Sequence, residues 1–320
     1  MLDDDTLPIL AVPAAISEWR GRGLLVSDVS DRNIKLYALD GRRIGTVGRA
    51  GQGPDEFGSL FSMETYHDSI AAYDLTRGLN IFSPAGRHAR MVPVQRLAGH
   101  GVMFVRVVDD SLFLLVGTAM GNVARRLLTL VRPGGERVST FFDQSHHFDG
   151  TAALAERVFV DADGRDGVVF AGLVGGDSIF AFDYSGRLLA SAPVDPVRPL
   201  TTTKQLLARN RGRPRRPDGN WVTQDNRQVF RIIALDSATA VVYVAPYDAR
   251  AGSDLVEGGT LIALGLSGGK LHHLARSEVP AGLFGRDERG SALLLGYADA
   301  EHEKVRVSRL RLVRGKEQAR

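Results

Sequence analysis

The chain has 320 residues, of which 44% are hydrophobic and 24% charged, a balance typical of a globular protein with a buried core. Its 40 basic and 37 acidic residues leave a formal charge of only +3, which argues against an extended surface for polyanions. Cysteine is absent, which excludes disulfides and thiolate metal sites.

No apolar run approaches the ~20 residues of a membrane span, so we expect no transmembrane segment. The first ten residues, MLDDDTLPIL, are acidic and lack the basic and apolar regions of a signal peptide. Two locations stay open: the cytoplasm, if Met1 is the native start, or export as a mature domain that carries an added Met1.

One unit recurs along the chain: an apolar β-rich run, a polar turn, a second alternating run and a glycine turn. The units end, in chain order, at Gly41, Gly86, Gly134, Gly186, Gly268 and Gly315. Successive ends are 45 to 52 residues apart, except for one interval of 82. This period matches a four-stranded propeller blade of about 40 to 50 residues, with the glycine turns between the third and fourth strands.

Six units predict one all-β domain over residues 1–320, a six-bladed β-propeller with four-stranded antiparallel blades. The blades are expected at residues 14–47, 60–94, 101–142, 156–194, 228–276 and 282–313. The last unit has only three strands, so we expect residues 7–12 to supply its outer strand and close the ring. Deletion of residues 1–13 should then sharply lower the Tm, and an unchanged Tm would contradict this closure.

The stretch IKLYALDGRRIGTVGRAGQGPDEF resembles the NHL-type and TolB-like bacterial six-bladed β-propellers, whose hairpin runs into a glycine-rich GqGPGEF loop. The matching residues are Gly48, Gly51, Gln52, Gly53, Pro54, Glu56 and Phe57, while Asp55 replaces the commoner glycine. The close match covers residues 24–92. The resemblance implies the fold and an exported or periplasmic location, but no activity, because propellers host binding, scaffolding and several enzymes.

In such a ring, the crossover between blades and the loop between strands two and three share one face, which we expect to be functional. The glycine-rich crossover 45–58 has no Lys-Ser/Thr and no following helix, so a phosphate site is disfavoured. Its glycines indicate tight backbone passage, and Phe57 is expected to fill the core between the first two blades. Asp55 and Glu56 are adjacent, so at most one would face the channel in an extended chain.

The long interval contains an insertion at 195–227 that is rich in arginine. Five arginines fall within eight residues of RNRGRPRRPDG, and four of them, Arg211, Arg213, Arg215 and Arg216, are candidate ligand contacts. One interpretation is an ordered lid that binds an anion by bidentate contacts. The other is a solvated loop. Nucleic acid is disfavoured, because only Trp221 offers an aromatic ring beside these cations.

The histidines suggest a metal site as an alternative to an anion-binding site. His146, His147 and Asp149 lie in the crossover after the third blade and are weak candidates for a divalent cation. The resemblance adds weight, since six-bladed relatives include metal-dependent lactonases and a zinc-dependent lyase. The lactonase-type ligand set is missing, however, and no third ligand is evident. We therefore expect no cofactor.

The sequence favours a non-catalytic propeller that binds a small molecule, peptide or glycan, preferably anionic, at the channel mouth. Besides the insertion, the candidate contacts on this face are Gln52, Asp55 and Tyr247. Two alternatives stay open: a metal-dependent hydrolase or lyase using the histidines, and a scaffold for a protein partner.

Overall fold

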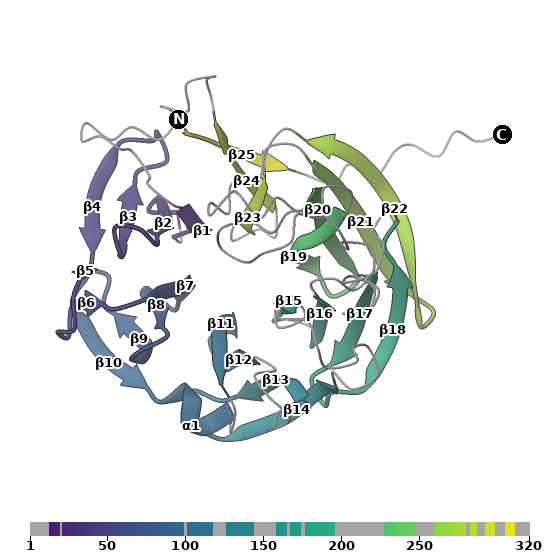
Figure 1. Ribbon diagram of the computed structural model, residues 1–320, viewed down its shortest axis with the longest axis horizontal. Coiled ribbons are helices and arrows are strands. Elements are labelled where there is room, and N and C mark those ends of the chain that lie inside the picture. Colours follow the sequence, from purple (N-terminus) through teal and green to yellow (C-terminus); the bar gives the residue numbers. More distant parts are fainter. Residues whose placement is uncertain are drawn as a thin grey trace, which may run out of the picture.

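The protein is described here from a computed structural model. The structure describes residues 13–19, 21–98, 101–117, 126–143, 158–164, 167–173, 177–195, 227–246, 259–279, 282–286, 292–297 and 305–310. Figure 1 shows the antiparallel sheets standing around a central axis, in chain order, as the blades of a β-propeller.

The first three blades each have four antiparallel strands in consecutive order. The first consists of β1 (Pro13–Glu18), β2 (Leu24–Asp28), β3 (Asn33–Tyr37) and β4 (Arg43–Val47). The second consists of β7 (Leu60–Tyr66), β8 (Ser69–Asp74), β9 (Gly78–Phe82) and β10 (His88–Val92). The third consists of β11 (Val102–Asp109), β12 (Leu112–Gly117), β13 (Arg126–Val131) and β14 (Arg137–Asp143).

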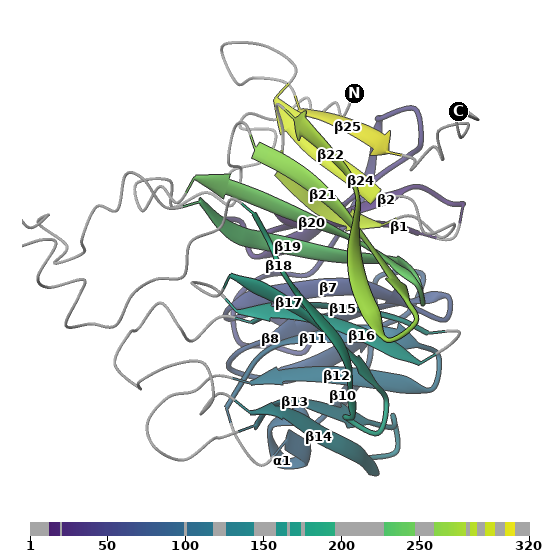
Figure 2. The ribbon, with the colours of Figure 1, turned by 90° about the vertical axis from the view of Figure 1, so that its right-hand side faces the viewer.

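The fourth and fifth blades repeat this arrangement. The fourth consists of β15 (Val158–Asp163), β16 (Val168–Leu173), β17 (Ser178–Asp183) and β18 (Leu188–Pro193). The fifth consists of β19 (Arg227–Asp236), β20 (Thr239–Pro246), β21 (Gly259–Ser267) and β22 (Lys270–Val279). The long edge strand β22 curves along the outside of the ring (Figure 2).

The last sheet has three strands: β23 (Gly282–Arg286), β24 (Ala292–Tyr297) and β25 (Val305–Leu310). The expectation of six four-stranded blades is thus corrected, since the described residues form five such blades and one three-stranded sheet. The sixth unit of the repeat corresponds to this three-stranded sheet and not to a sixth four-stranded blade. Residues 7–12, the expected fourth strand, lie outside the described residues, and closure by them stays a prediction.

The described strands nevertheless bring the two ends of the ring together. Strand β23 passes so close to β1 that a Cβ added at Gly285 would lie 1.8 Å from the carbonyl oxygen of Ile16. Beside this contact, the Arg309 guanidinium on β25 is 2.9 Å from a carboxylate oxygen of Glu18 on β1. Glycine at position 285 is required because any side chain there would collide with the backbone of the first blade.

The core lies between the blades, because both faces of each sheet are covered by neighbours. All five side chains of β2 are buried, and so are all six of β12 and of β16. Such strands read as continuous apolar runs instead of alternating ones. The outer strands alternate or are exposed, as in β22, where eight of ten side chains are exposed.

The glycine turns between third and fourth strands are confirmed at Gly41, Gly86 and Gly186, all with positive φ. In the third blade, Gly135 instead of Gly134 takes the positive φ. These hairpins also contact the preceding blade: a Cβ at Gly186 would lie 2.6 Å from Cβ of Phe141. Glycine therefore recurs at this position for two reasons: the turn needs a left-handed backbone, and the hairpin passes close to the preceding blade.

A short pair of strands and a short helix complete the described structure. Strands β5 (Arg49–Ala50) and β6 (Glu56–Phe57) pair in parallel within the glycine-rich crossover, and α1 (Val94–Ala98) joins the second and third blades. Within the residues described, no helix is long and apolar enough to span a membrane.

Candidate functional site

The glycine-rich crossover is organised around the carboxylate of Glu56. One carboxylate oxygen accepts the backbone N–H groups of Gln52 and Gly53 at 2.8 and 2.7 Å. The other accepts Nε of Arg49 at 2.9 Å. The Gly53 amide and the Arg49 guanidinium lower the pKa of Glu56, so this carboxylate stays ionised and engaged. The Glu56 carboxylate holds the loop in its conformation, and it is not available to act as a general base.

Phe57 fills the core as predicted. Its side chain is fully buried between blades one and two, together with Leu36 and Val47 on one side and Ile70 and Phe82 on the other. Gly48 has φ of 73°, and a Cβ there would lie 2.2 Å from the Phe57 ring. The glycines of this crossover therefore serve packing.

Asp74 ties the crossover to the hairpin that connects β8 and β9. Its buried carboxylate accepts the N–H groups of Ser59, Thr76 and Arg77 at 2.8–3.1 Å. Burial alone would raise the pKa of Asp74, but these hydrogen bonds and the Thr76 hydroxyl outweigh it and lower the pKa. Arg77 in turn donates to the carbonyl oxygens of Gly53 and Glu56. The crossover and the hairpin thus share one face, as expected.

Gln52 and Asp55 are placed on this crossover, which lies at the outer edge of the ring (Figure 1). Asp55 accepts the backbone N–H of His88, the first residue of the outer strand β10, at 2.9 Å. The side-chain amide of Gln52 lies beside Gly58. Neither residue borders the central axis in this arrangement, and their role as ligand contacts stays a prediction.

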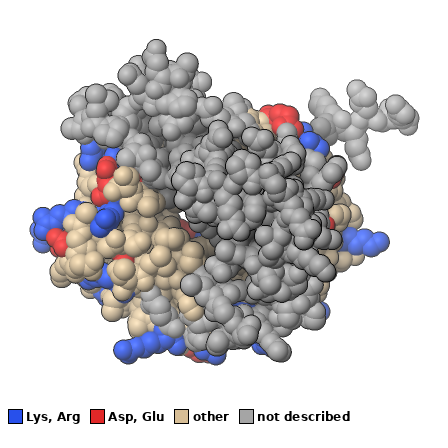
Figure 3. Space-filling view, viewed as in Figure 1, with Lys and Arg blue, Asp and Glu red and all other residues tan. Residues whose placement is uncertain are grey.

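The remaining candidate residues lie outside the described part of the chain. They are Arg211, Arg213, Arg215, Arg216, Trp221, Tyr247, His146, His147 and Asp149. Among the described residues, no group of three or more His, Asp or Glu side chains is arranged to hold a metal ion. On the face seen in Figure 3, Lys and Arg of the described residues lie mainly along the outer edge.

The sequence analysis did not predict that most inner strands carry a β-bulge, one unpaired extra residue, near their start. In β1, β7, β11, β19 and β23 the register with the next strand skips one residue, forming a β-bulge. The bulged residues are Ala14, Phe61, Met103, Phe230 and Phe284, and the second residue of the regular strand β15 is Phe159. Bulges re-aim side chains and are over-represented beside functional sites.

We call these six positions the channel collar. Phe61 is 36% exposed although it lies on the innermost strand of its blade, and Met103 and Phe159 are partly buried. Strand β7 packs against the first and third blades and is the strand of its blade nearest the axis of the ring (Figure 1). An apolar doublet such as Leu-Phe, Val-Met or Val-Phe at the start of the inner strands was the signal for this collar in the sequence.

Farther along the inner strands, charged side chains link the blades. Arg106 on β11 contacts Glu64 on β7 at 2.5 Å and Asp161 on β15 at 2.9 Å. Asp161 also accepts the backbone N–H of Ala234 on β19 at 3.0 Å. Burial disfavours the charge on Arg106, but Asp161 and Glu64 more than compensate and raise its pKa. This inner-wall triad joins four successive blades.

No family model matches the chain, and no curated protein matches it either. Solved structures with a similar fold include a predicted exported protein from Bacteroides fragilis, with a TM-score of 0.59 at 12% identity. That similarity covers 92% of this chain and 82% of the other. A DUF4221-family member from Bacteroides vulgatus gives the same TM-score and identity, covering 92% and 89%.

A third similar structure is a catalytically inactive variant of virginiamycin B lyase from Staphylococcus aureus with quinupristin. Its TM-score is 0.50 at 10% identity, and the match covers 92% of this chain and 78% of the lyase. At this level of identity the three structures show a shared β-propeller fold and no shared activity. The NHL-like type suggested by the glycine loop is not confirmed.

Proposed function

We propose that the protein is a non-catalytic β-propeller that binds a small molecule, peptide or glycan at the mouth of its central channel. The observation that carries this proposal is the channel collar. A bulge recurs near the start of five inner strands, and the described large side chains of the collar, Phe61, Met103 and Phe159, are apolar and incompletely buried.

The collar suits an apolar or ring-shaped part of a ligand. Phe61 is the exposed aromatic side chain among the described residues of the collar, and a ligand that buried it fully would gain up to about 1.5–3 kcal/mol. The inner-wall triad supports a binding role over catalysis, because Glu64 and Asp161 are both engaged by Arg106. A general base needs a carboxylate that can take up a proton near neutral pH.

An anionic group on the ligand is favoured by the arginine-rich insertion. In the sequence, Arg211, Arg213, Arg215 and Arg216 follow the fourth blade. Bidentate arginine contacts to a carboxylate or phosphate would complement apolar contacts at the collar. Trp221 and Tyr247 are proposed as further contacts.

The test is a thermal-shift screen of acidic oligosaccharides, short acidic peptides and aryl carboxylates on the full chain, with calorimetry on every hit. Phe61→Ala should weaken a channel ligand about tenfold, because the exposed ring loses its contact area. Leu39→Ala is the matched control: Leu39 is 59% exposed, far from the axis in the β3–β4 hairpin, and affinity should not change. A screen without hits, or a hit equally strong with Phe61→Ala and with the fourfold arginine-to-alanine variant, would contradict the proposal.

Lyase chemistry is the second candidate, and similarity in fold to virginiamycin B lyase is the observation that favours it. His146, His147 and Asp149 would then hold a divalent cation. Metal analysis of protein purified without a histidine tag separates the two functions. Stoichiometric metal that is lost with His147→Ala would favour the lyase over a simple binding protein.

Export is proposed as the location, since a fold-related protein from Bacteroides fragilis is itself a predicted exported protein. Fractionation of the native cells with an antibody against this chain tests it. Recovery only in the cytoplasmic fraction would contradict export.

A further inference from the structure

The outer wall of the second and third blades carries arginines that are not paired. Residues 87–98 contain three arginines and no carboxylate, while residues 132–140 contain two arginines and one carboxylate. Arg87 and Arg90 in the second blade and Arg96 on α1 are exposed, and no described carboxylate forms an ion pair with any of the three. The formal charge of only +3 for the whole chain therefore conceals a local excess of positive charge.

These residues belong to one continuous surface. A single residue separates β10 from α1, whose Val94 and Ala98 are buried in the core, so that Arg96 lies on the outer side. Arg137, at the start of β14, donates to the carbonyl oxygen of Leu97 on α1, from Nη2 at 2.8 Å and from Nε at 3.3 Å. Figure 1 shows β10, α1 and β14 in succession along one edge of the ring, and Figure 3 shows basic side chains projecting from that edge.

Large apolar side chains are exposed beside these arginines. Met91, next to Arg90 on β10, is 50% exposed, and Val138, next to Arg137 on β14, is 39% exposed. Since β10 and β14 are the outer edge strands of their sheets, side chains from both of their faces border the solvent. We call Arg87, Arg90, Met91, Arg96, Arg137 and Val138 the outer-wall patch.

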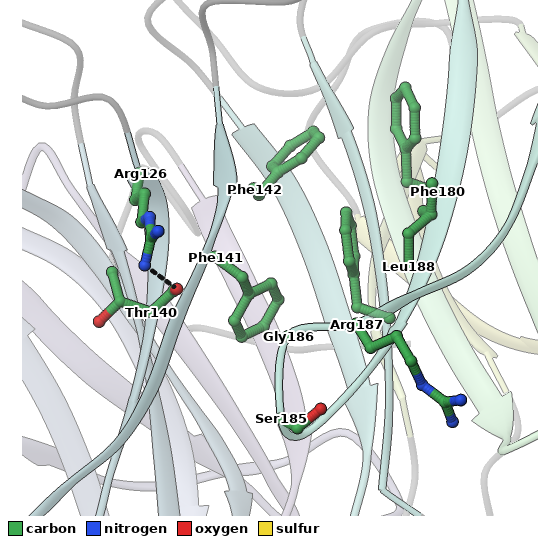
Figure 4. A pocket seen from close by; sticks show the side chains of 10 residues that line it. Arg126, Thr140, Phe141, Phe142, Phe180, Ser185, Gly186, Arg187 and Leu188 are labelled. Atoms are coloured by element: carbon green, nitrogen blue, oxygen red, sulfur yellow. Dashed lines mark hydrogen bonds between the residues drawn. The ribbon is translucent and has the colours of Figure 1, made fainter.

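Arginines on either side of the outer-wall patch are paired. In the crossover that precedes the second blade, Arg49 contacts Glu56 at 2.9 Å. In the fourth blade, Arg187 contacts Asp183 at 2.9 Å, and Figure 4 shows its side chain turned away from Phe142. The patch differs from these neighbouring stretches of wall because its cations have no described carboxylate partners.

Two described carboxylates border the patch, but they are already engaged and are outnumbered. Glu136 contacts Arg132 at 3.0 Å in the hairpin that leads to β14. Asp55 accepts the backbone N–H of His88 at 2.9 Å. Five arginines thus lie near two carboxylates on this part of the wall, and the excess of cations suits an anionic surface.

We propose that the outer-wall patch docks the protein on an anionic lipid membrane, with the guanidinium groups at the lipid phosphates and Met91 and Val138 in the headgroup region. Arginine forms bidentate contacts with phosphate, and a surface that joins cations to aliphatic side chains suits the bilayer interface. Residues 87–98 and 132–140 contain no Phe, Tyr or Trp, on which protein interfaces and sites for single-stranded nucleic acid mostly depend. The patch lies on outer strands and the channel collar on inner strands, so the two sites are independent.

The experiment measures sedimentation of the full-length protein with vesicles of phosphatidylcholine alone and of an equimolar mixture with phosphatidylglycerol. The protein should bind the mixed vesicles at low salt, bind the neutral vesicles far more weakly, and dissociate as the salt concentration rises. The triple variant Arg87→Gln, Arg90→Gln, Arg96→Gln should bind the mixed vesicles about a hundredfold more weakly, since each arginine near an anionic membrane contributes about fivefold. Met91→Ser should weaken binding about threefold, because its apolar contact is lost.

The matched control is the triple variant Arg32→Gln, Lys270→Gln, Arg276→Gln, which removes the same charge from exposed positions on the first and fifth blades. It should bind the mixed vesicles nearly as well as the wild type. Equal losses in the two triple variants, equal binding to both kinds of vesicle, or no vesicle binding at all would overturn the proposal. Binding to soluble heparin or polyaspartate that is lost with the first triple variant, without vesicle binding, would assign the patch to an acidic macromolecule instead. All six substituted positions are exposed, and an unchanged Tm verifies that each variant is folded.

Discussion

The inner wall and the third strand of the third blade, β13, each contain an arginine, but the two cations have different surroundings. Arg106 is 18% exposed and lies between Glu64 and Asp161, which are 13% and 2% exposed. Arg126 is exposed, and its one described partner is a backbone carbonyl. The buried cation is held between two carboxylates and ties blades together, whereas the exposed one is solvated by water and contributes little to stability. Burial and pairing, and not residue type, decide how much an arginine contributes to the fold.

The largest effect is expected when the inner-wall triad loses its cation. Arg106→Met leaves the carboxylates of Glu64 and Asp161 buried without the cation that they share, which should lower the free energy of unfolding by about 3–5 kcal/mol. Urea denaturation measures the loss. Adding Glu64→Gln and Asp161→Asn to Arg106→Met should restore part of the stability, because the uncompensated charges are then removed. Arg126→Gln should change stability by less than about 0.5 kcal/mol, and comparable losses for both arginines would end the distinction between them.

A smaller loss is expected when the crossover at the outer edge is overpacked. Gly48→Ala combines a left-handed φ of 73° with a Cβ only 2.2 Å from the Phe57 ring, so we expect a loss of about 2–4 kcal/mol. Gly268→Ala is the matched control, because φ is 54° and nothing lies within 4 Å of the added Cβ. It should cost only about 1 kcal/mol. The difference between the two variants in chemical denaturation isolates the contact with Phe57.

The smallest effect concerns the hairpin between β17 and β18 in the fourth blade, and it depends on pH. The Ser185 hydroxyl, then the Arg187 side chain and amide, hold the pKa of Asp183 at about 2, below its ordinary 3.8. The ionised carboxylate therefore stabilises the fold above about pH 4, and this contribution disappears as the pH falls through about 2. Asp183→Asn should be less stable than the wild type at neutral pH, with a difference that shrinks in acid. A difference independent of pH would show that Asp183 acts by shape alone.

The sequence predicted the blade-like repeat and several of its details for a local reason. Runs of Val, Leu, Ile and Phe separated by glycine turns are decided within 20 residues, so the hairpins at Gly41, Gly86 and Gly186 were correctly expected. Phe57 was correctly assigned to the core between the first two blades, because a large apolar residue that follows a polar glycine loop is stabilised by burial. The count of four-stranded blades was wrong, because a repeat marks units and not the strands that each unit supplies.

The phenylalanine contacts between the third and fourth blades and the inner-wall triad were not predicted, for the same reason. Phe142 and Phe180 are 38 residues apart, and Glu64 and Asp161 are separated by 97. A polar residue inside an apolar strand, such as Glu64 in LFSMETY, is a local signal of a buried partner, but the partner is not local. Pairing across blades depends on how neighbouring sheets twist and stack.

By itself, then, the sequence determined the strands, the left-handed turns and the residues that must be buried, because these follow from apolar patterning and backbone sterics. Only the tertiary structure decided which arginine is held between buried carboxylates and which is exposed, and which phenylalanines of neighbouring blades meet. Those properties arise from distances between side chains on different blades, and such distances are set by the closing of the ring.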